Sequence, residues 1–143
     1  MRKKTLLATL LLASLALLHA ADAPKADASG SDIIVASYYC GNYHPNDVRN
    51  EKQKGKGWAE WELVKAAKPR FPGHRQPIVP LWGYTDESDP KAMAQKIDAA
   101  ADHGISAFIF DWYYYDDGPF LERPIDIGFL QATNNSRIKF AFM

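Results

Sequence analysis

The sequence contains a single cysteine, Cys40, among 143 residues, so no disulfide can form within the chain. It also lacks an excess of charge of either sign, because 17 basic residues balance 17 acidic ones. Without a basic excess there is no electrostatic footprint for phosphates, and we expect no nucleic-acid partner. No cysteine pair, no cysteine–histidine spacing and no acidic calcium loop is present. We therefore expect no structural metal and no cofactor.

A hydrophobic run long enough to cross a membrane is also missing. The uncharged, leucine-rich stretch from Thr5 to Leu18 is shorter than the roughly 20 residues that a membrane-spanning helix needs. Basic residues precede it and small residues follow it, which is typical of a secretory signal peptide. We predict a signal peptide over residues 1–23, with a single N-terminal anchor as the alternative, and a flexible leader over residues 24–31. The mature protein should be periplasmic, extracellular or at the cell surface, without stable membrane association.

Beyond the leader, apolar runs alternate with helical patterns. Asp32–Tyr39, Ile105–Phe110 and Arg137–Met143 predict buried strands. Between the first two strands, Asp89 and Pro90 begin a helical pattern that Gly104 ends.

The connections are less regular. Residues 41–57 are rich in turn formers and predict a loop, whereas residues 58–68 predict one or two helical turns. Residues 71–84 predict an irregular connection, and residues 121–132 carry a weaker helical stripe.

Strands that alternate with helices in this way predict the α/β class, with parallel strands joined by right-handed crossovers. Three strands neither form a sheet covered on both faces nor close into a barrel, and a (β/α)8 barrel takes ~250 residues. We therefore predict that residues 32–143 form the N-terminal portion, about three strands, of an incomplete (β/α)8 TIM barrel.

Aromatic, acidic and imidazole side chains gather where the first two predicted strands end. They are Tyr38, Tyr39, His44, Asp111, Trp112 and Tyr113. Ligands of parallel α/β proteins bind beyond the carboxyl ends of the strands, so these side chains should share one rim. Sugar rings pack their C–H faces on aromatic side chains, while carboxylates accept their hydroxyls. The pattern therefore predicts a saccharide site, whose catalytic residues remain unassigned.

Each of these residues also has a structural interpretation. Asp111 could cap a helix or form an ion pair, and Trp112 and Tyr113 could pack loop on loop. His44 could be a satisfied structural histidine, and Cys40 a small buried filler, with a Cys40–His44 nucleophile as a less favoured alternative.

A second cluster of aromatic and acidic residues runs from Trp58 to Glu62. In one interpretation, Trp58 and Trp61 dock one helical face on the fold and Glu60 is solvated. In the other, the loop lies over the site, and Trp58 or Glu60 reaches the ligand.

Three segments carry a family resemblance: GKGWAEWELVKAAKPRFPGHRQP, PLWGYTDESDP and HGISAFIFDWYYYDDGPFLE. They resemble the N-terminal section of the WbsX-like proteins, also described as glycoside hydrolase family 99-like TIM-barrel proteins. The likeness runs from Ile33 to Met143. It implies binding roles for Tyr38 and Tyr39 and for the Asp111–Trp112 pair. Family 99 enzymes carry their catalytic carboxylates on later strands, so the resemblance implies an N-terminal fragment without a catalytic pair.

Members of that family are named both as glycosyltransferases of polysaccharide gene clusters and as relatives of endo-acting α-mannosidases. Our leading expectation is an exported glycoside hydrolase that acts on a polysaccharide or glycan, with two carboxylic groups in the complete protein. The alternatives are a WbsX-type glycosyltransferase in polysaccharide biosynthesis and a non-catalytic glycan-binding remnant. The predicted signal peptide argues against transfer, because nucleotide-sugar donors are cytosolic. Residues 1–143 alone should be inactive.

Overall fold

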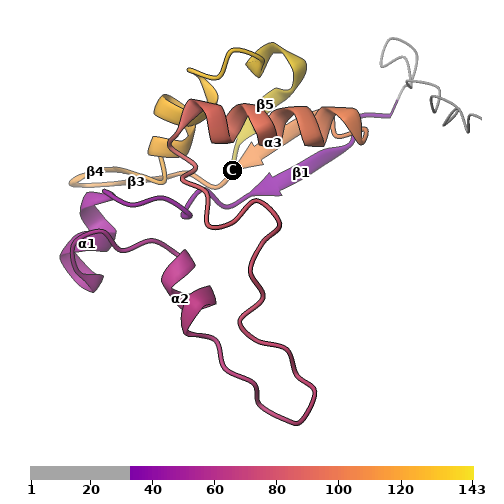
Figure 1. The fold of residues 1–143 in the computed structure, drawn as a ribbon. Helices are drawn as coiled ribbons and strands as arrows, with labels where there is room; N and C mark the ends of the chain where they lie inside the picture. Colours follow the sequence, from indigo (N-terminus) through magenta and orange to yellow (C-terminus); the bar gives the residue numbers. More distant parts are fainter. Residues whose placement is uncertain (1–32) are drawn as a thin grey trace, which may run out of the picture.

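A three-stranded parallel sheet forms the centre of the computed structural model, which describes residues 33–143 (Figure 1). Its strands β1 (Ala36–Tyr39), β2 (Ala107–Phe110) and β5 (Lys139–Phe142) lie in the order β1–β2–β5. All three are parallel, which confirms the predicted α/β class and the neighbouring parallel strands. The predicted signal peptide, residues 1–23, and the leader, residues 24–31, lie outside the described residues.

Helix α3 (Pro90–Asp102) connects β1 to β2 and lies along the sheet in Figure 1. Asp89 caps it, because the Asp89 carboxylate accepts a hydrogen bond from the Lys91 backbone N–H at 2.9 Å. Pro90 occupies the first helical position, where its missing N–H costs nothing. Gly104, with φ +87°, turns the chain after the helix in a conformation that favours glycine. The predicted helix is thus confirmed with both of its end signals.

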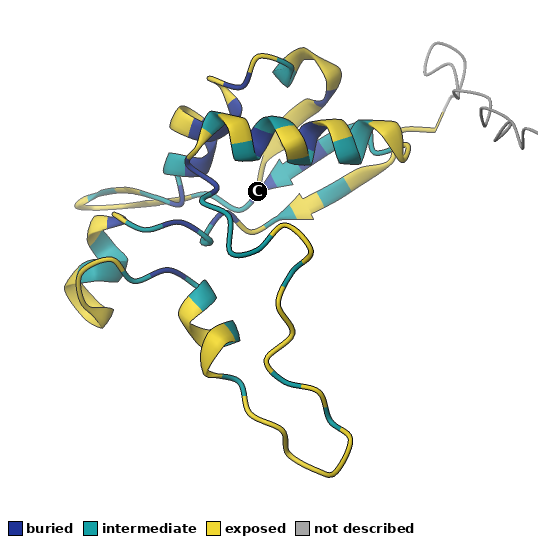
Figure 2. Cartoon of the chain, viewed as in Figure 1, coloured by how far each residue is buried: buried dark blue, intermediate teal, exposed yellow. Residues whose placement is uncertain are grey.

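The core lies between α3, one face of the sheet and η1 (Pro124–Phe129), a short π-helix. Its buried side chains are Met93, Ile97, Phe108, Phe110, Ile125, Phe129, Ala132 and Ile138. Figure 2 shows this burial concentrated along α3, β2 and η1. Gly128 permits a close approach, since a Cβ there would lie 2.2 Å from the Glu87 carbonyl oxygen. The helix predicted over residues 121–132 is shorter than expected, because only η1 forms within that range.

The two faces of the sheet differ in coverage. Successive side chains of a strand point to opposite faces, and Tyr39, Phe108 and Phe110 belong to the side that packs on α3 and η1. The other side, here called the open face, carries Ala36, Tyr38, Ala107, Ile109, Lys139 and Ala141. Tyr38 is 71% exposed there. The prediction of buried strands is thus wrong for the open face and for the edge strand β5, all four residues of which are exposed. Within the sheet, only Phe108 and Phe110 of β2 are buried.

The connection after β1 contains a helix where a loop was predicted. Helix α1 (Val48–Lys54) begins at Asp47, whose carboxylate accepts a hydrogen bond from the Asn50 backbone N–H at 2.7 Å. The short helix α2 (Trp61–Ala66) follows within the predicted helical turns. The loop prediction for residues 41–57 is therefore wrong over α1.

After β2 the chain forms a hairpin that was not predicted. Its strands, β3 (Tyr113–Tyr115) and β4 (Gly118–Phe120), are antiparallel. A short 3-10 helix, η2 (Asn135–Arg137), precedes β5. Among residues 33–143, no helix is both long and apolar enough to cross a membrane.

Candidate functional site

The three parallel strands end at one edge of the sheet, here called the carboxyl edge. The ladder continues past the strands, because the Asp111 N–H donates to the Tyr39 carbonyl at 3.1 Å and the Met143 N–H to the Phe110 carbonyl at 3.0 Å. Helix α1 and the β3–β4 hairpin lie beyond this edge (Figure 1). The residues predicted to bind a ligand thus fall at or near a single edge, as the parallel order requires.

Strand alternation nevertheless divides these residues between the two faces. The Tyr39 ring packs on the helix-covered side, with its centroid 5.0 Å from that of Phe108 and 4.9 Å from that of Phe110. Tyr38 and Asp111 alternate to the open face. The expectation that all strand-end side chains share one rim is therefore wrong for Tyr39 and Asp111, which occupy the same edge on opposite faces.

Asp111 is half-buried, and its carboxylate has no hydrogen-bond donor or ion-pair partner among residues 33–143. It lies close enough to Cys40 to influence that thiol. Loss of solvation raises the pKa of Cys40, and the negative charges of Asp111, Glu60 and Glu87 raise it further. The side chain of Cys40 is exposed, so the prediction of a buried filler is wrong. A raised pKa also disfavours the Cys40–His44 nucleophile, because the thiolate is the reactive form.

Glu60 belongs to a network of polar side chains rather than to the solvated surface. Its carboxylate accepts a hydrogen bond from the Asn42 amide at 2.9 Å, and Asn42 accepts one from the Asn50 amide at 2.6 Å. Loss of solvation, followed by the charge of Glu60, raises the pKa of Tyr43. Glu60 and Asp111 thus contribute negative charge to the same part of the carboxyl edge.

The two tryptophans of this segment have different roles. Trp61 docks on the fold: its ring centroid lies 4.4 Å from that of Tyr43 and 5.3 Å from that of Tyr84, and its indole N–H donates to the Thr85 carbonyl at 2.7 Å. Trp58 is half-buried and makes no ring contact with the described aromatic residues. The docking interpretation therefore holds for Trp61. Trp58 does not pack on an aromatic residue in this way, so its ring stays a candidate for ligand contact.

Glu87, which was not predicted from the sequence, joins the loop after β1 to the start of α3. Its buried carboxylate accepts hydrogen bonds from the Tyr39 hydroxyl at 2.7 Å and the Tyr43 backbone N–H at 3.1 Å, and it pairs with Lys96. Burial raises the pKa of Tyr39 well above its ordinary value, and the charge of Glu87 adds to that effect. The half-buried hydroxyl of Tyr39 thus acts as a hydrogen-bond donor. Glu87 lies two residues before the Asp89 cap in the segment TDESDP, and nothing in that context distinguishes it from a solvated acid.

The ring of His44 lies in the interior. The side chain is 0% exposed, with Nδ1 2.9 Å from the Pro45 carbonyl oxygen. Its Nε2 atom has no hydrogen-bond partner among the described residues. A ligand at the surface of the carboxyl edge would not reach this ring.

Two cavities adjoin the β3–β4 hairpin. The first, of about 240 Å³, is lined by Trp112, Pro119, Glu122, Ile125, Asp126 and Phe142. The Trp112 ring packs there 5.7 Å from Phe142 and 5.8 Å from Tyr114. Tyr113, by contrast, is exposed on the hairpin, with its ring 6.2 Å from that of Tyr115. Trp112 thus lines an aromatic cavity on the helix-covered side, whereas Tyr113 does not.

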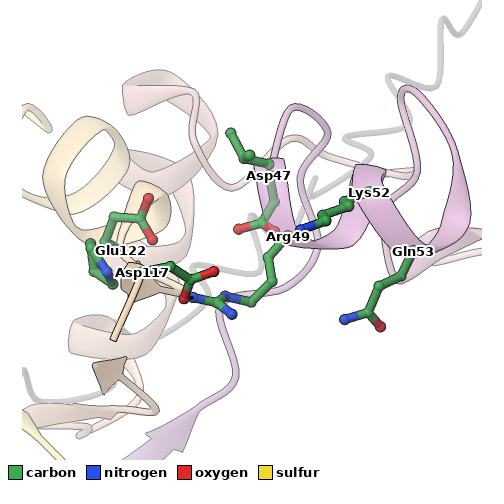
Figure 3. A pocket seen from close by; sticks show the side chains of 8 residues that line it. Asp47, Arg49, Lys52, Gln53, Asp117 and Glu122 are labelled. Atoms are coloured by element: carbon green, nitrogen blue, oxygen red, sulfur yellow. Dashed lines mark hydrogen bonds and ion pairs between the residues drawn. The ribbon is translucent and has the colours of Figure 1, made fainter. Parts of the chain in front are cut away.

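The second cavity is a charged cleft of about 400 Å³ between α1 and the hairpin. Figure 3 shows Arg49 extending from α1 toward Asp117, with which it forms an ion pair. Glu122 lines both cavities, and its Oε2 atom is buried without a partner among the described residues. Leu121, directly before it, has φ +65°, a strained value for this residue. Glu122 was not predicted, because nothing in its sequence context distinguishes it from a solvated acid.

Over residues 33–143, no group of three or more histidine, cysteine, aspartate or glutamate side chains is arranged to hold a metal ion.

Comparison with known proteins identifies the family. The family model described as "Glycosyltransferase WbsX" matches residues 35–143. Two proteins from strains of Xanthomonas campestris pv. campestris, each described as "Uncharacterized protein WxcX", are 34% identical to this chain over 92 residues. The match covers 64% of this chain and spans only 13% of the length of each relative. No solved structure matches the chain. The predicted resemblance is thus confirmed, and the chain belongs to the WbsX glycosyltransferase family.

Proposed function

We propose that this chain is part of a carbohydrate-active enzyme whose glycan substrate binds at the carboxyl edge, on the open face of the sheet. The observation that carries the proposal is the Asp111 carboxylate, half-buried and without a donor among the described residues. An ionised carboxylate offers two acceptor oxygens, enough for two neighbouring sugar hydroxyls. Tyr38, 71% exposed on the same face, offers an aromatic surface for the C–H face of a sugar ring.

The proposal extends to the fold. Helices cover one face of this parallel sheet, and the other face carries three alanines beside Tyr38, Ile109 and Lys139. That division suits a (β/α)8 barrel, in which helices form the outer ring and the second face points inward. The carboxyl edge would then be the mouth of the barrel, where the active sites of this fold lie. Asp111 would stand at that mouth as a binding residue.

Hydrolysis of a glycosidic bond is the reaction that the charge at this edge favours. Asp111 and Glu60 both contribute to a negative field, which acts on the nearby thiol of Cys40. A neutral glycan meets no repulsion there, whereas the diphosphate of a nucleotide sugar does. The two carboxylic groups that hydrolysis requires are not assigned to residues of this chain.

Glycosyl transfer is the second candidate, and the description of the matching family model favours it. The two reactions differ in what they consume, so one experiment separates them. The complete gene product is incubated with a panel of bacterial polysaccharides, with and without nucleotide sugars. We expect new reducing ends to form without any nucleotide.

Chain extension that depends on a nucleotide sugar, without hydrolysis, would replace the hydrolase proposal with transfer. The absence of both reactions and of glycan binding would overturn the proposal of a carbohydrate-active enzyme. We also propose that the protein is exported, as its basic and leucine-rich N-terminus suggests. Cell fractionation tests this, and retention of the protein in the cytosol would contradict it.

A further inference from the structure

The connection between α2 and α3 contains a segment with charge of one sign. The basic loop, here residues 67–83, carries Lys68, Arg70 and Arg75 and no acidic residue. The three cations are exposed and form no ion pair with any residue from 33 to 143. In Figure 1 the loop extends from α2 away from the sheet and α3. The chain as a whole is neutral, so this positive charge is a local feature.

The same loop exposes large apolar side chains. Phe71, Ile78, Val79, Leu81 and Trp82 are all exposed, and Leu81 reaches 96%. Figure 2 shows most of the loop in the colour of exposed residues. Exposed apolar groups of this number, close together in one segment, mark an interaction site. They do not contribute to the core that α3 and the sheet form.

The loop is also shaped before any partner binds. The His74 N–H donates to the Phe71 carbonyl at 3.1 Å, and the Gly83 N–H to the Pro80 carbonyl at 2.9 Å, so a turn forms near each end. Pro77, between the two turns, restricts the backbone further. The indole N–H of Trp61 fixes the base of the loop at Thr85. A segment ordered in this way loses less entropy when it binds.

We propose that the basic loop binds the surface of an anionic lipid bilayer. Aliphatic and indole side chains enter the interface between headgroups and acyl chains, while cations beside them bind anionic headgroups. An anionic polysaccharide would satisfy Lys68, Arg70 and Arg75, but it would leave Leu81 and its aliphatic neighbours in water. The apolar half of the loop therefore favours lipid. This contact is reversible and confined to the bilayer surface. It is therefore compatible with the expectation that the protein has no stable membrane association.

The test uses the complete gene product with two kinds of vesicle, one of phosphatidylcholine alone and one that also contains phosphatidylglycerol. Co-sedimentation should show binding to the anionic vesicles, weakened by salt. Each cation contributes about a fivefold factor at an anionic surface, so the triple variant K68Q/R70Q/R75Q should bind about 100-fold more weakly. Leu81→Ser should also weaken binding, because an apolar group no longer enters the interface.

Matched variants provide the controls. K54Q/K56Q/K91Q removes the same charge from exposed lysines outside the basic loop, and Val48→Ser removes an apolar side chain that is 83% exposed on α1. Both should bind vesicles as the parent does. All variants share residues 1–32, so any affinity of that segment cancels in the ratios. Equal losses in loop and control variants, no binding to anionic vesicles, or loop-dependent binding to soluble polygalacturonate without binding to lipid would each overturn the proposal.

Discussion

Neutralising Glu87 should weaken the junction between β1 and α3 more than any loss of a surface charge. The buried Glu87 carboxylate receives the Tyr39 hydroxyl at 2.7 Å, the Tyr43 backbone N–H at 3.1 Å and the ammonium of Lys96. Glu87→Gln preserves the shape of the side chain. It removes the charge, however, and replaces one acceptor oxygen with a donor that faces another donor.

The expected cost follows from the burial of this pair. Removing one partner of a buried ion pair destabilises a protein by about 3–5 kcal/mol, because the other charge remains without compensation. The side chain of Lys96 is 20% exposed, so water recovers part of that loss. We therefore expect a loss near the lower end of the range, about 3 kcal/mol. That is a large share of a typical folding free energy of about 5–15 kcal/mol.

Asp98→Asn is the matched control, since it also neutralises an acid that pairs with a cation. Asp98 pairs with Arg137 on an exposed surface of α3, where solvent screens the charges. Urea unfolding of both variants and the parent, followed by tryptophan fluorescence and circular dichroism, gives the comparison. Glu87→Gln should lower the midpoint clearly, and Asp98→Asn should leave it almost unchanged. Similar midpoints for the two variants would refute the claim that Glu87 stabilises the junction between β1 and α3.

Three further predictions follow from the same contacts. Folding raises the pKa of Tyr39, so the stability that Tyr39 contributes is complete below the ordinary tyrosine pKa of about 10 and is lost as the pH rises through the folded value. Unfolding at alkaline pH tests this, and Tyr39→Phe should reduce the dependence of stability on pH, with the part due to Tyr43 and Cys40 remaining. Gly128→Ala should lower the melting temperature, because its Cβ would lie 2.2 Å from the Glu87 carbonyl oxygen, and an unchanged temperature would contradict the packing of η1. Asp111→Asn should speed alkylation of Cys40 at mildly alkaline pH, because it removes a negative charge that raises the pKa of the thiol. An unchanged alkylation rate would contradict the proximity of Asp111 to Cys40.

The sequence predicted the elements whose signals are local. Helix α3 has an aspartate cap, a proline at its first position and a glycine after its end, and each signal acts within a few residues. The parallel order of β1, β2 and β5 followed from the alternation of strands and helices. The hairpin of β3 and β4 was missed, because its tyrosines are exposed and show no alternation of polar and apolar residues.

The sequence correctly predicted that Tyr38, Tyr39 and Asp111 lie at one edge of the sheet, but not that they divide between its two faces. Which face a side chain occupies depends on where the strand register places it, and adjacent residues such as Tyr38 and Tyr39 differ completely. Glu87 and Glu122 could not be predicted, because their burial depends on partners distant in the sequence. A sequence pattern alone does not distinguish such acids from solvated ones.

The most direct test of glycan binding at the carboxyl edge compares two acidic residues that follow β2. In the complete gene product, Asp111→Asn removes the half-buried carboxylate of the open face, and the control Asp116→Asn removes an exposed one at the hairpin turn. Hydrogen bonds to a charged group are worth about 1.5–3 kcal/mol, so Asp111→Asn should weaken binding of the substrate glycan by about 10- to 100-fold in titration calorimetry. Asp116→Asn should bind as the parent does. Equal affinity of the parent and Asp111→Asn would contradict the proposal that this edge holds the glycan.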